Sequence, residues 1–300
     1  MSMGTTAIQA SRTSAGAVRT VLGIFKLRIG VLITISTLAG LAITPGPAVG
    51  AWQGLVLALS VLVASASAGA FNQWVEADAD RLMVRTRQRA FASGALTPSP
   101  LWLAVIGTLL AAAVGATWFV VNAVAAGFIF LGAFFYGVVY TMWLKRRTPL
   151  NIVIGGLSGS FAVLAGAAAV DPTLGPLPWL LALVLFLWTP PHFWSLAIAC
   201  EADYAAAGVP MLPVVVGVPR AARTVHAYAL VLVAVSLLPM AFGAGPVVLV
   251  GALIGGAHFL RKTWALARAP SRATAMASFF ASMVQLSALL AAVAVDAALR

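Results

Sequence analysis

The chain contains very few acidic residues. Its 300 residues include only seven Asp and Glu against eighteen Lys and Arg, and charged residues make up 8% of the sequence. An ordinary soluble domain carries about 25% charged residues, so this composition excludes that class. The single cysteine, Cys200, excludes an internal disulfide and a metal site built from several cysteines.

Long hydrophobic runs take the place of charge. Hydrophobic residues make up 62% of the chain, and the mean hydropathy is +1.03. Runs of about twenty apolar residues, the length that crosses a bilayer as a helix, recur along the sequence. We locate them near residues 22–43, 50–71, 100–119, 123–144, 151–170, 177–199, 225–243, 245–260 and 274–297. Their Ala, Leu, Val and Gly content without strict alternation favours helices over a β-barrel.

The sequence therefore predicts an all-α polytopic membrane protein with about nine transmembrane helices. Residues 22–300 form one transmembrane domain, because no segment outside the apolar runs is long enough for a separate soluble domain. Residues 1–21 contain Arg, Ser and Thr but no acid, a composition shared with transit peptides. We interpret them instead as a short cytoplasmic tail, which is the more common arrangement.

The basic residues cluster in alternate connections between the predicted helices. The connections near 44–49, 120–122, 171–176 and 242–246 contain no Lys or Arg, whereas the intervening ones contain nearly all of them. This is the positive-inside pattern, and it predicts a cell (inner) membrane protein with its N-terminus in the cytoplasm and its C-terminus outside. The net charge of +11 is thus mainly a topology signal rather than a sign of nucleic-acid binding, with phosphate binding as a second role for some residues.

The first acidic cluster closes the second apolar run. Asn72, Glu76 and Asp80 are spaced at i, i+4 and i+8, which places them along one face of a helix, whereas Asp78 points away if that helix continues. Carboxylates near hydrocarbon are costly unless a cation or water compensates them. One amide oxygen and two carboxylates are suitable ligands for Mg²⁺, which a substrate's phosphates often complete.

Several arginines follow this cluster, including Arg85 and Arg89. Guanidinium groups beside a metal-binding stripe suit a diphosphate, since the metal and the arginines take different phosphate oxygens. Two other interpretations remain open for this cluster. The arginines can be topology determinants with the acids as salt-bridge partners, or the acids can belong to an ion pathway, although such acids usually lie in mid-membrane.

The second acidic cluster, Glu201 and Asp203, falls on the same predicted side of the membrane. If Asp203 faces the first cluster it completes a second metal position; otherwise the pair belongs to a solvated loop. Lys145 and Arg146, after the fourth run, lie on that side too and are placed to reach the same phosphates.

A proline pair precedes the second cluster inside the sixth run. Pro190 and Pro191 predict a broken helix with free carbonyl groups. The next residue, His192, can serve as a ligand or general base, but a hydrogen bond to a neighbouring group is the favoured interpretation.

Together these segments resemble the UbiA prenyltransferase superfamily, and within it the branch that acts on protohaem IX. The resemblance covers about residues 22–297. It rests on four ordered blocks: Asn72–Arg89, Tyr140–Gly156, Trp188–Trp194, and Asp203–Tyr204 with Gly208–Pro213. It implies a helical bundle around a lipid-accessible central cavity, Mg²⁺-assisted ionisation of farnesyl diphosphate, and capture of the farnesyl cation by a vinyl group of protohaem.

The resemblance also implies roles for particular residues. Asn72, Glu76 and Asp80 would hold one Mg²⁺–diphosphate contact and Asp203 the other. The remaining substrate-binding residues that it implies are Arg85, Arg89, Lys145, Arg146 and Tyr204. A downstream haem-modifying membrane enzyme is a further partner that this activity allows.

The chain departs from the family pattern in three places: Glu76 replaces the usual Asp, Cys200–Asp203 lacks a basic residue and moves one acid, and Phe161–Ala167 lacks the usual Pro and Trp. Three alternatives therefore stay open, namely a quinone-type aromatic acceptor, a non-catalytic transporter or haem-binding protein, and an inactive paralogue. The Asp pattern of the CDP-alcohol phosphotransferases is absent from the sequence.

Overall fold

The computed structural model describes residues 18–299, and within this range the chain is helical with no strand. Most of the predicted tail, residues 1–17, lies outside the described residues, as does Arg300; residues 18–21 lie in a short helix, Val18–Ile24. The elements that follow are α2 (Leu27–Ile43), α3 (Ala51–Val75), α4 (Ala77–Leu82), α5 (Pro100–Val120), α6 (Ala123–Phe134), η1 (Phe135–Leu144), α7 (Asn151–Gly155), α8 (Leu157–Val170), α9 (Pro176–Ala199), α10 (Glu201–Ala206), α11 (Leu212–Val216), α12 (Val218–Leu237), η2 (Leu238–Phe242), α13 (Pro246–Arg268) and α14 (Arg272–Ala298).

The prediction of an all-α, multi-pass membrane protein is confirmed, but the count of nine spans is not. Seven helices of the described chain are long and apolar enough to cross a membrane, or up to eight if Val18–Ile24 and α2, bent by 45°, form one span. Helix α13 has the necessary length but does not qualify. Its last turns carry Arg261, Lys262 and Arg268, which lower its hydropathy.

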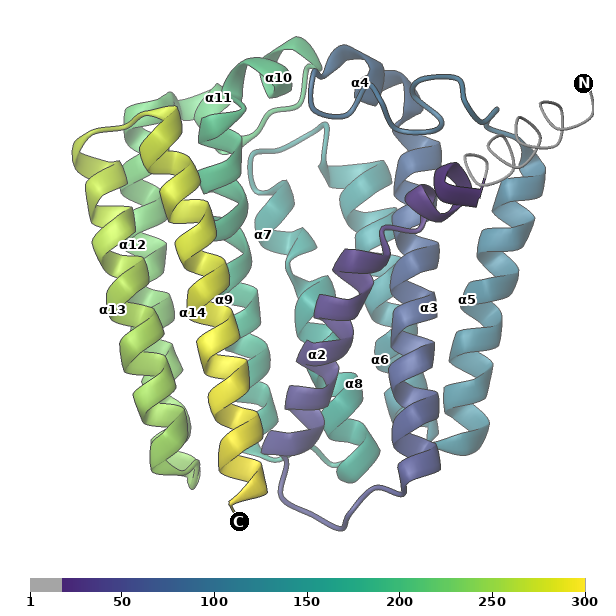
Figure 1. The fold of residues 1–300 in the computed structure, drawn as a ribbon, viewed down its shortest axis with the longest axis vertical. Helices are drawn as coiled ribbons and strands as arrows, with labels where there is room; N and C mark the ends of the chain where they lie inside the picture. The colour runs from purple at the N-terminus through teal and green to yellow at the C-terminus, as the bar shows by residue number, and fades with distance from the viewer. Residues whose placement is uncertain (1–17, 300) are drawn as a thin grey trace, which may run out of the picture.

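The long helices lie side by side along the longest axis of the molecule (Figure 1). Helix pairs α13–α14, α2–α8, α9–α12, α3–α5 and α6–α8 pack against each other. The short helices α4, α10 and α11 lie together at one end of the bundle, the end at which the described chain starts, and the C-terminus lies at the other end. Both acidic clusters are in these short helices or beside them, so the fold brings the clusters to the same end.

Two glycines allow α2 and α8 to cross at close range. A Cβ added to Gly40 would meet the carbonyl oxygen of Val163, and one added to Gly166 would meet that of Thr37. Small residues of this kind let membrane helices approach until their backbones touch. The crossing fixes α2, whose first turn leads into the acidic end of the bundle.

The fourth predicted span changes its helix type halfway. Helix α6 is followed by η1, a ten-residue π-helix in which Lys145 N–H donates to the Tyr140 carbonyl at 2.9 Å. The Thr141 hydroxyl adds a second bond, to the carbonyl of Tyr136 at 2.7 Å. π-Helical turns occur frequently at functional sites, and this one ends beside the first acidic cluster.

The prediction that Pro190 and Pro191 break the sixth span is wrong. Helix α9 continues through both prolines from Pro176 to Ala199. Both prolines are buried between neighbouring helices, and this packing keeps the chain helical although the two amide hydrogens are missing. The favoured interpretation of His192 is confirmed, since its Nδ1 lies 2.7 Å from the Ser282 hydroxyl.

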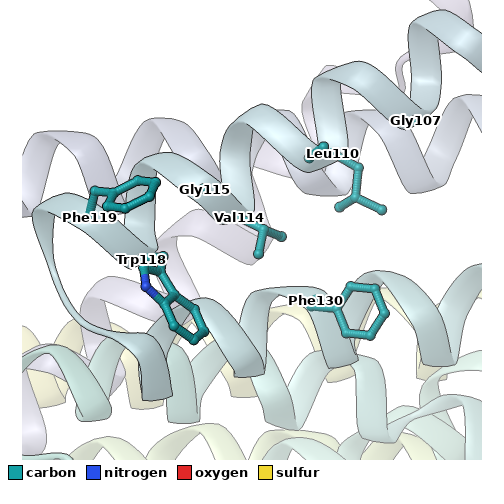
Figure 2. Close-up of a pocket in the computed structure, with 8 residues that line it drawn as sticks. Gly107, Leu110, Val114, Gly115, Trp118, Phe119 and Phe130 are labelled. Atoms are coloured by element: carbon teal, nitrogen blue, oxygen red, sulfur yellow. The ribbon is translucent and has the colours of Figure 1, made fainter.

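An apolar groove runs between α5 and α6 on the outside of the bundle (Figure 2). Trp118 and Phe119 lie at one end of it, and Phe130 of α6 forms part of its wall. Trp118 and Phe119 are exposed, as expected for a lipid-facing surface. This groove contains none of the predicted site residues, and the predicted central cavity stays a prediction.

The α2–α8 crossing yields a stability prediction. Gly166→Ala pushes the new methyl group into the Thr37 carbonyl, so we expect the free energy of unfolding in detergent to fall by about 1–3 kcal/mol. Gly107→Ala is the matched control, because a Cβ there meets nothing within 4 Å. We expect the control to unfold at or above the wild-type temperature, and equal melting temperatures for the two variants would contradict the close crossing.

Candidate functional site

The helical spacing of Asn72, Glu76 and Asp80 is kept where helix α3 meets helix α4. Helix α3 ends at Val75 and α4 begins at Ala77, but the i→i+4 bonds from Glu76 N to Asn72 O (3.0 Å) and from Asp80 N to Glu76 O (2.8 Å) continue across the joint. The three residues are 2%, 3% and 1% exposed. The stripe is therefore buried, and its two carboxylates need cationic or hydrogen-bonding partners to be stable there.

Glu76 is held by a cation and an amide. Lys145, at the end of η1, forms an ion pair with Glu76 Oε1. Asn72 Nδ2 donates to Glu76 Oε2 at 2.9 Å and to the Thr141 hydroxyl at 3.1 Å. The other side of the amide, Asn72 Oδ1, accepts a 2.6 Å bond from Lys26 Nζ. Three segments far apart in the sequence, around residues 26, 72–76 and 141–145, thus meet in one polar network.

Asp80 has a cationic partner of its own. Arg89 Nη1 donates to both oxygens of the carboxylate, at 3.0 and 2.8 Å. The Thr86 hydroxyl donates to the main-chain carbonyl of Asp80 at 3.1 Å. As predicted, Asp78 points away, since it is exposed and Arg81 is its one ion-pair partner among residues 18–299.

The second cluster holds the loop that follows α4. The Asp203 carboxylate accepts backbone N–H bonds from Val84 and Arg85, both at 3.3 Å. Arg85 Nη2 then donates to the hydroxyl of Tyr204 at 3.3 Å. The two clusters are therefore connected through residues 83–89. Arg146, in contrast, is exposed, and it makes no hydrogen bond or ion pair with the rest of the described chain.

Each acidic side chain of the site is bonded to a basic side chain or to backbone amides. Glu76, Asp80 and Asp203 bind three different sets of donors, and residues 18–299 contain no group of three His, Cys, Asp or Glu placed to hold a metal. The donors themselves fit Mg²⁺, because carboxylate and amide oxygens are its preferred protein ligands and substrate phosphates often complete its shell. Such an ion would therefore depend on phosphate oxygens as well as on these side chains.

Sequence reasoning missed three members of this network. Lys26 falls among the basic residues that the sequence analysis interprets as topology signals, and neither Tyr136 nor Thr141 received a role. Lys26 lies inside the first apolar run together with Arg28, and a cation in such a run is a signal for a polar or anionic partner, although the sequence does not show which of the two is turned inward. The π-helix that presents the other two has no comparable signature in the sequence.

Comparison with known proteins identifies a family. The model of the UbiA prenyltransferase family matches residues 33–284. Protoheme IX farnesyltransferase 2 of Paramagnetospirillum magneticum is 56% identical over 273 residues, which are 91% of this chain and 95% of that protein. Protoheme IX farnesyltransferase 1 of Cenarchaeum symbiosum is 39% identical over 285 residues, covering 93% of this chain and 96% of that protein.

Solved structures share the fold at low identity. A digeranylgeranylglyceryl phosphate synthase superimposes with a TM-score of 0.76 at 20% identity, covering 94% of this chain and 99% of that one. A UbiA homologue from Archaeoglobus fulgidus bound to DMAPP and Mg²⁺ gives a TM-score of 0.68 at 13% identity, with coverages of 89% and 98%. The predicted bundle architecture therefore recurs among these membrane proteins.

The Asp80–Arg89 pair yields a prediction about folding. Arg89→Met leaves a buried carboxylate without its cation, so we expect the free energy of unfolding in detergent to fall by about 3–5 kcal/mol. Arg81→Met removes the partner of exposed Asp78 and one hydrogen bond to the Ala92 carbonyl, so it should lower the free energy of unfolding by no more than about 2 kcal/mol. The double variant Asp80→Leu/Arg89→Met should regain most of the loss; if Arg89→Met unfolds like Arg81→Met, the pair does not carry this role.

Proposed function

The chain belongs to the UbiA prenyltransferase family, and on that basis we propose that it transfers the farnesyl group of farnesyl diphosphate to protohaem IX, giving haem O. The relatives with this activity in their names cover the chain almost from end to end. The observation that carries the chemistry is the buried network of alternating acids and bases at one end of the bundle.

The reaction separates charge before it forms a bond. The C–O bond of the donor breaks, the diphosphate keeps the electron pair, and an allylic cation remains. The terminal carbon of a haem vinyl group then forms a C–C bond with this cation, and water adds as hydroxide while its proton is released. Catalysis therefore needs fixed positive charge where the diphosphate lies.

We assign the metal-binding role to Asn72, Glu76, Asp80 and Asp203. Their oxygens suit Mg²⁺, and the structural relative bound to DMAPP and Mg²⁺ supports a divalent ion at the diphosphate. When bound, such an ion would neutralise charge on the leaving diphosphate. The carboxylate of Asp203 meanwhile orients the loop after α4 through the Val84 and Arg85 amides.

The basic residues of the network are assigned to the diphosphate. Arg89 and Lys145 are held in place by buried carboxylates, and Arg85 by its contact with Tyr204. Such preorganised cations stabilise developing negative charge without having to reorganise during the reaction. Arg146 is exposed and would have to turn inward to take part.

Aromatic rings lie next to these cations. Tyr136 and Tyr140 stack with their centroids 5.8 Å apart, and Lys145 Nζ lies 5.7 Å from the Tyr140 ring centroid. The electron-rich face of an aromatic ring attracts a cation, and this attraction is stronger away from water. We assign the two tyrosines to the allylic end of the donor.

The segment that motivated a quinone-type acceptor has a packing role. Residues 162–168 of α8 are buried, and Gly166 contacts α2. Phe161 stacks on Phe128 and makes an edge contact with Phe135. The unusual sequence of this stretch therefore serves helix packing, and protohaem remains the acceptor that we propose.

The proposed setting is the cell inner membrane. The basic loops and both acidic clusters would face the cytoplasm and the C-terminus the outside. Both substrates would enter from the bilayer or its surface, and the farnesylated haem would pass to a membrane enzyme that modifies haem further.

Product analysis tests the proposed activity. Membranes containing the chain, protohaem IX, farnesyl diphosphate and Mg²⁺ should form a haem bearing a hydroxyethylfarnesyl group, detected by mass spectrometry. Asp80→Asn removes one charged oxygen of the proposed metal site and should lower the rate by about a hundredfold or more. Chelation of divalent ions should have a similar effect.

A control distinguishes the site from general damage. Asp78→Asn changes an exposed acid two residues away and should keep near-wild-type activity. Release of diphosphate and farnesol without haem modification would leave the ionisation site intact but refute the acceptor. Equal activity of Asp78→Asn and Asp80→Asn would refute the assigned stripe.

Cysteine labelling tests the orientation in the membrane. In a Cys200→Ala background, Gln88→Cys and Pro172→Cys place single thiols at exposed positions near the two ends of the bundle. A membrane-impermeant maleimide should label Pro172→Cys in intact cells, and Gln88→Cys only after the cells are permeabilised. The reverse pattern would invert the proposed topology.

A further inference from the structure

The chain bends sharply between the helix Val18–Ile24 and α2, and Lys26 lies in the bend. Its backbone is left-handed, with φ 47° and ψ 42°; Leu174 is the only other non-glycine residue of the described chain with positive φ. This conformation is unfavourable for a lysine and persists where the surrounding structure enforces it, often at functional sites.

Gln73 of α3 holds the bend in place. Its Nε2 donates to the carbonyls of Gly23 at 3.1 Å and of Ile24 at 3.0 Å, the last residues of the short helix. The Gln73 side chain is buried, as is Ile24. One amide thus satisfies two helix-end carbonyls and fixes where the next residues of the chain must go.

The lysine side chain is directed along α3 into the polar network. A Cβ added to Gly69 would lie 3.4 Å from Cβ and Cδ of Lys26, so the glycine provides room for the aliphatic stem. At the far end, Nζ donates to Asn72 Oδ1 at 2.6 Å and lies 3.5 Å from the hydroxyl of Tyr136. Lys26 therefore contacts both the proposed metal stripe and the π-helix.

Lys26 differs from the neighbouring cations in that its ammonium group makes no direct ion pair within the described chain. Lys145 is neutralised by Glu76 and Arg89 by Asp80, whereas Lys26 binds a neutral amide and forms no ion pair with any described carboxylate. An ammonium group has three donors, and the two contacts named leave at least one of them open. A half-buried ammonium group with an open donor favours an anionic partner.

We propose that Lys26 is a further catalytic residue, whose ammonium group donates a hydrogen bond to the diphosphate of the prenyl donor, and that Gln73 is the residue that positions it. The assignment rests on the proposed function for the identity of the anion. Lys26 keeps its proton throughout: the diphosphate leaves with the electron pair of the C–O bond, and the N–H stabilises the charge that it gains.

The competing interpretation is that Lys26 is only a topology determinant. Arg28 provides a matched control, because it lies two residues further on, is exposed, and forms no ion pair within the described chain. If both residues only set the topology, substitution of either one should affect diphosphate binding equally. If Lys26 contacts the diphosphate, only its substitution should weaken binding.

The first test measures binding of inorganic diphosphate with Mg²⁺ to the purified protein by isothermal titration calorimetry. Lys26→Met should weaken binding at least about tenfold, the effect expected for one lost charge-assisted hydrogen bond. Lys26→Arg should retain part of the affinity, and Arg28→Met should stay within about twofold of wild type. Equal binding by Lys26→Met and Arg28→Met would overturn the proposal, as would a wild type that does not bind diphosphate.

The second test concerns Gln73 and uses kcat/KM for farnesyl diphosphate. Gln73→Leu should lower this value in the wild type but add little in the Lys26→Met background, because both changes remove the same contact. A purely structural Gln73 would lower it by the same factor in both backgrounds. Melting temperatures of all variants identify any that fail to fold. If Lys26→Met fails to fold, Lys26→Arg is compared with the wild type in its place.

These readouts separate the two proposals. Diphosphate binding that depends on Lys26, in a protein that forms no farnesylated haem, would support Lys26 and refute the acceptor. Farnesylated haem formed equally well by Lys26→Met would support the activity and refute the role of Lys26.

Discussion

The structure depends on the burial of carboxylates in a chain that is 62% hydrophobic. Glu76 and Asp80 are almost inaccessible, and a buried charge is tolerated only when it is paired and hydrogen-bonded. Lys145 and Arg89 meet this requirement from two different segments. One end of the bundle is therefore organised by charge pairing, whereas packing of small and apolar side chains organises the rest.

The irregular parts of the backbone gather around these charges. The joint at Glu76 turns the chain between α3 and α4 while preserving the spacing of the stripe. The π-helix brings Thr141 into contact with Asn72 and Lys145 into contact with Glu76. The bend at Lys26 brings the lysine side chain to Asn72 as well. Such departures from regular helix are unfavourable on their own, so their concentration here indicates that the contacts they make possible offset that cost.

The parts that the sequence predicted are local, and the parts that it missed depend on distant contacts. The apolar runs indicated the spans, and the i, i+4 spacing indicated the stripe of Asn72 and Glu76, because helix periodicity is a short-range property. The bond from Lys26 to Asn72 joins residues 46 apart, and the bonds from Asp203 to the loop after α4 join residues more than 100 apart. Nothing in a single sequence specifies such pairs, and the same holds for α9, where neighbouring helices overrule the local effect of two prolines.

The cations of the site differ in how firmly the backbone that carries them is held. Lys26 begins a helix that is fixed near its start by Gln73 and along its length by the α2–α8 crossing, and Lys145 ends a helix that Glu76 holds. Groups on such rigid elements keep their positions more accurately than groups on loops. Arg85 belongs instead to the loop after α4, and its position depends on Asp203 and Tyr204. In the proposed site, Lys26 and Lys145 would therefore fix where the diphosphate binds, and Asp203 would hold the loop that carries Arg85 beside them.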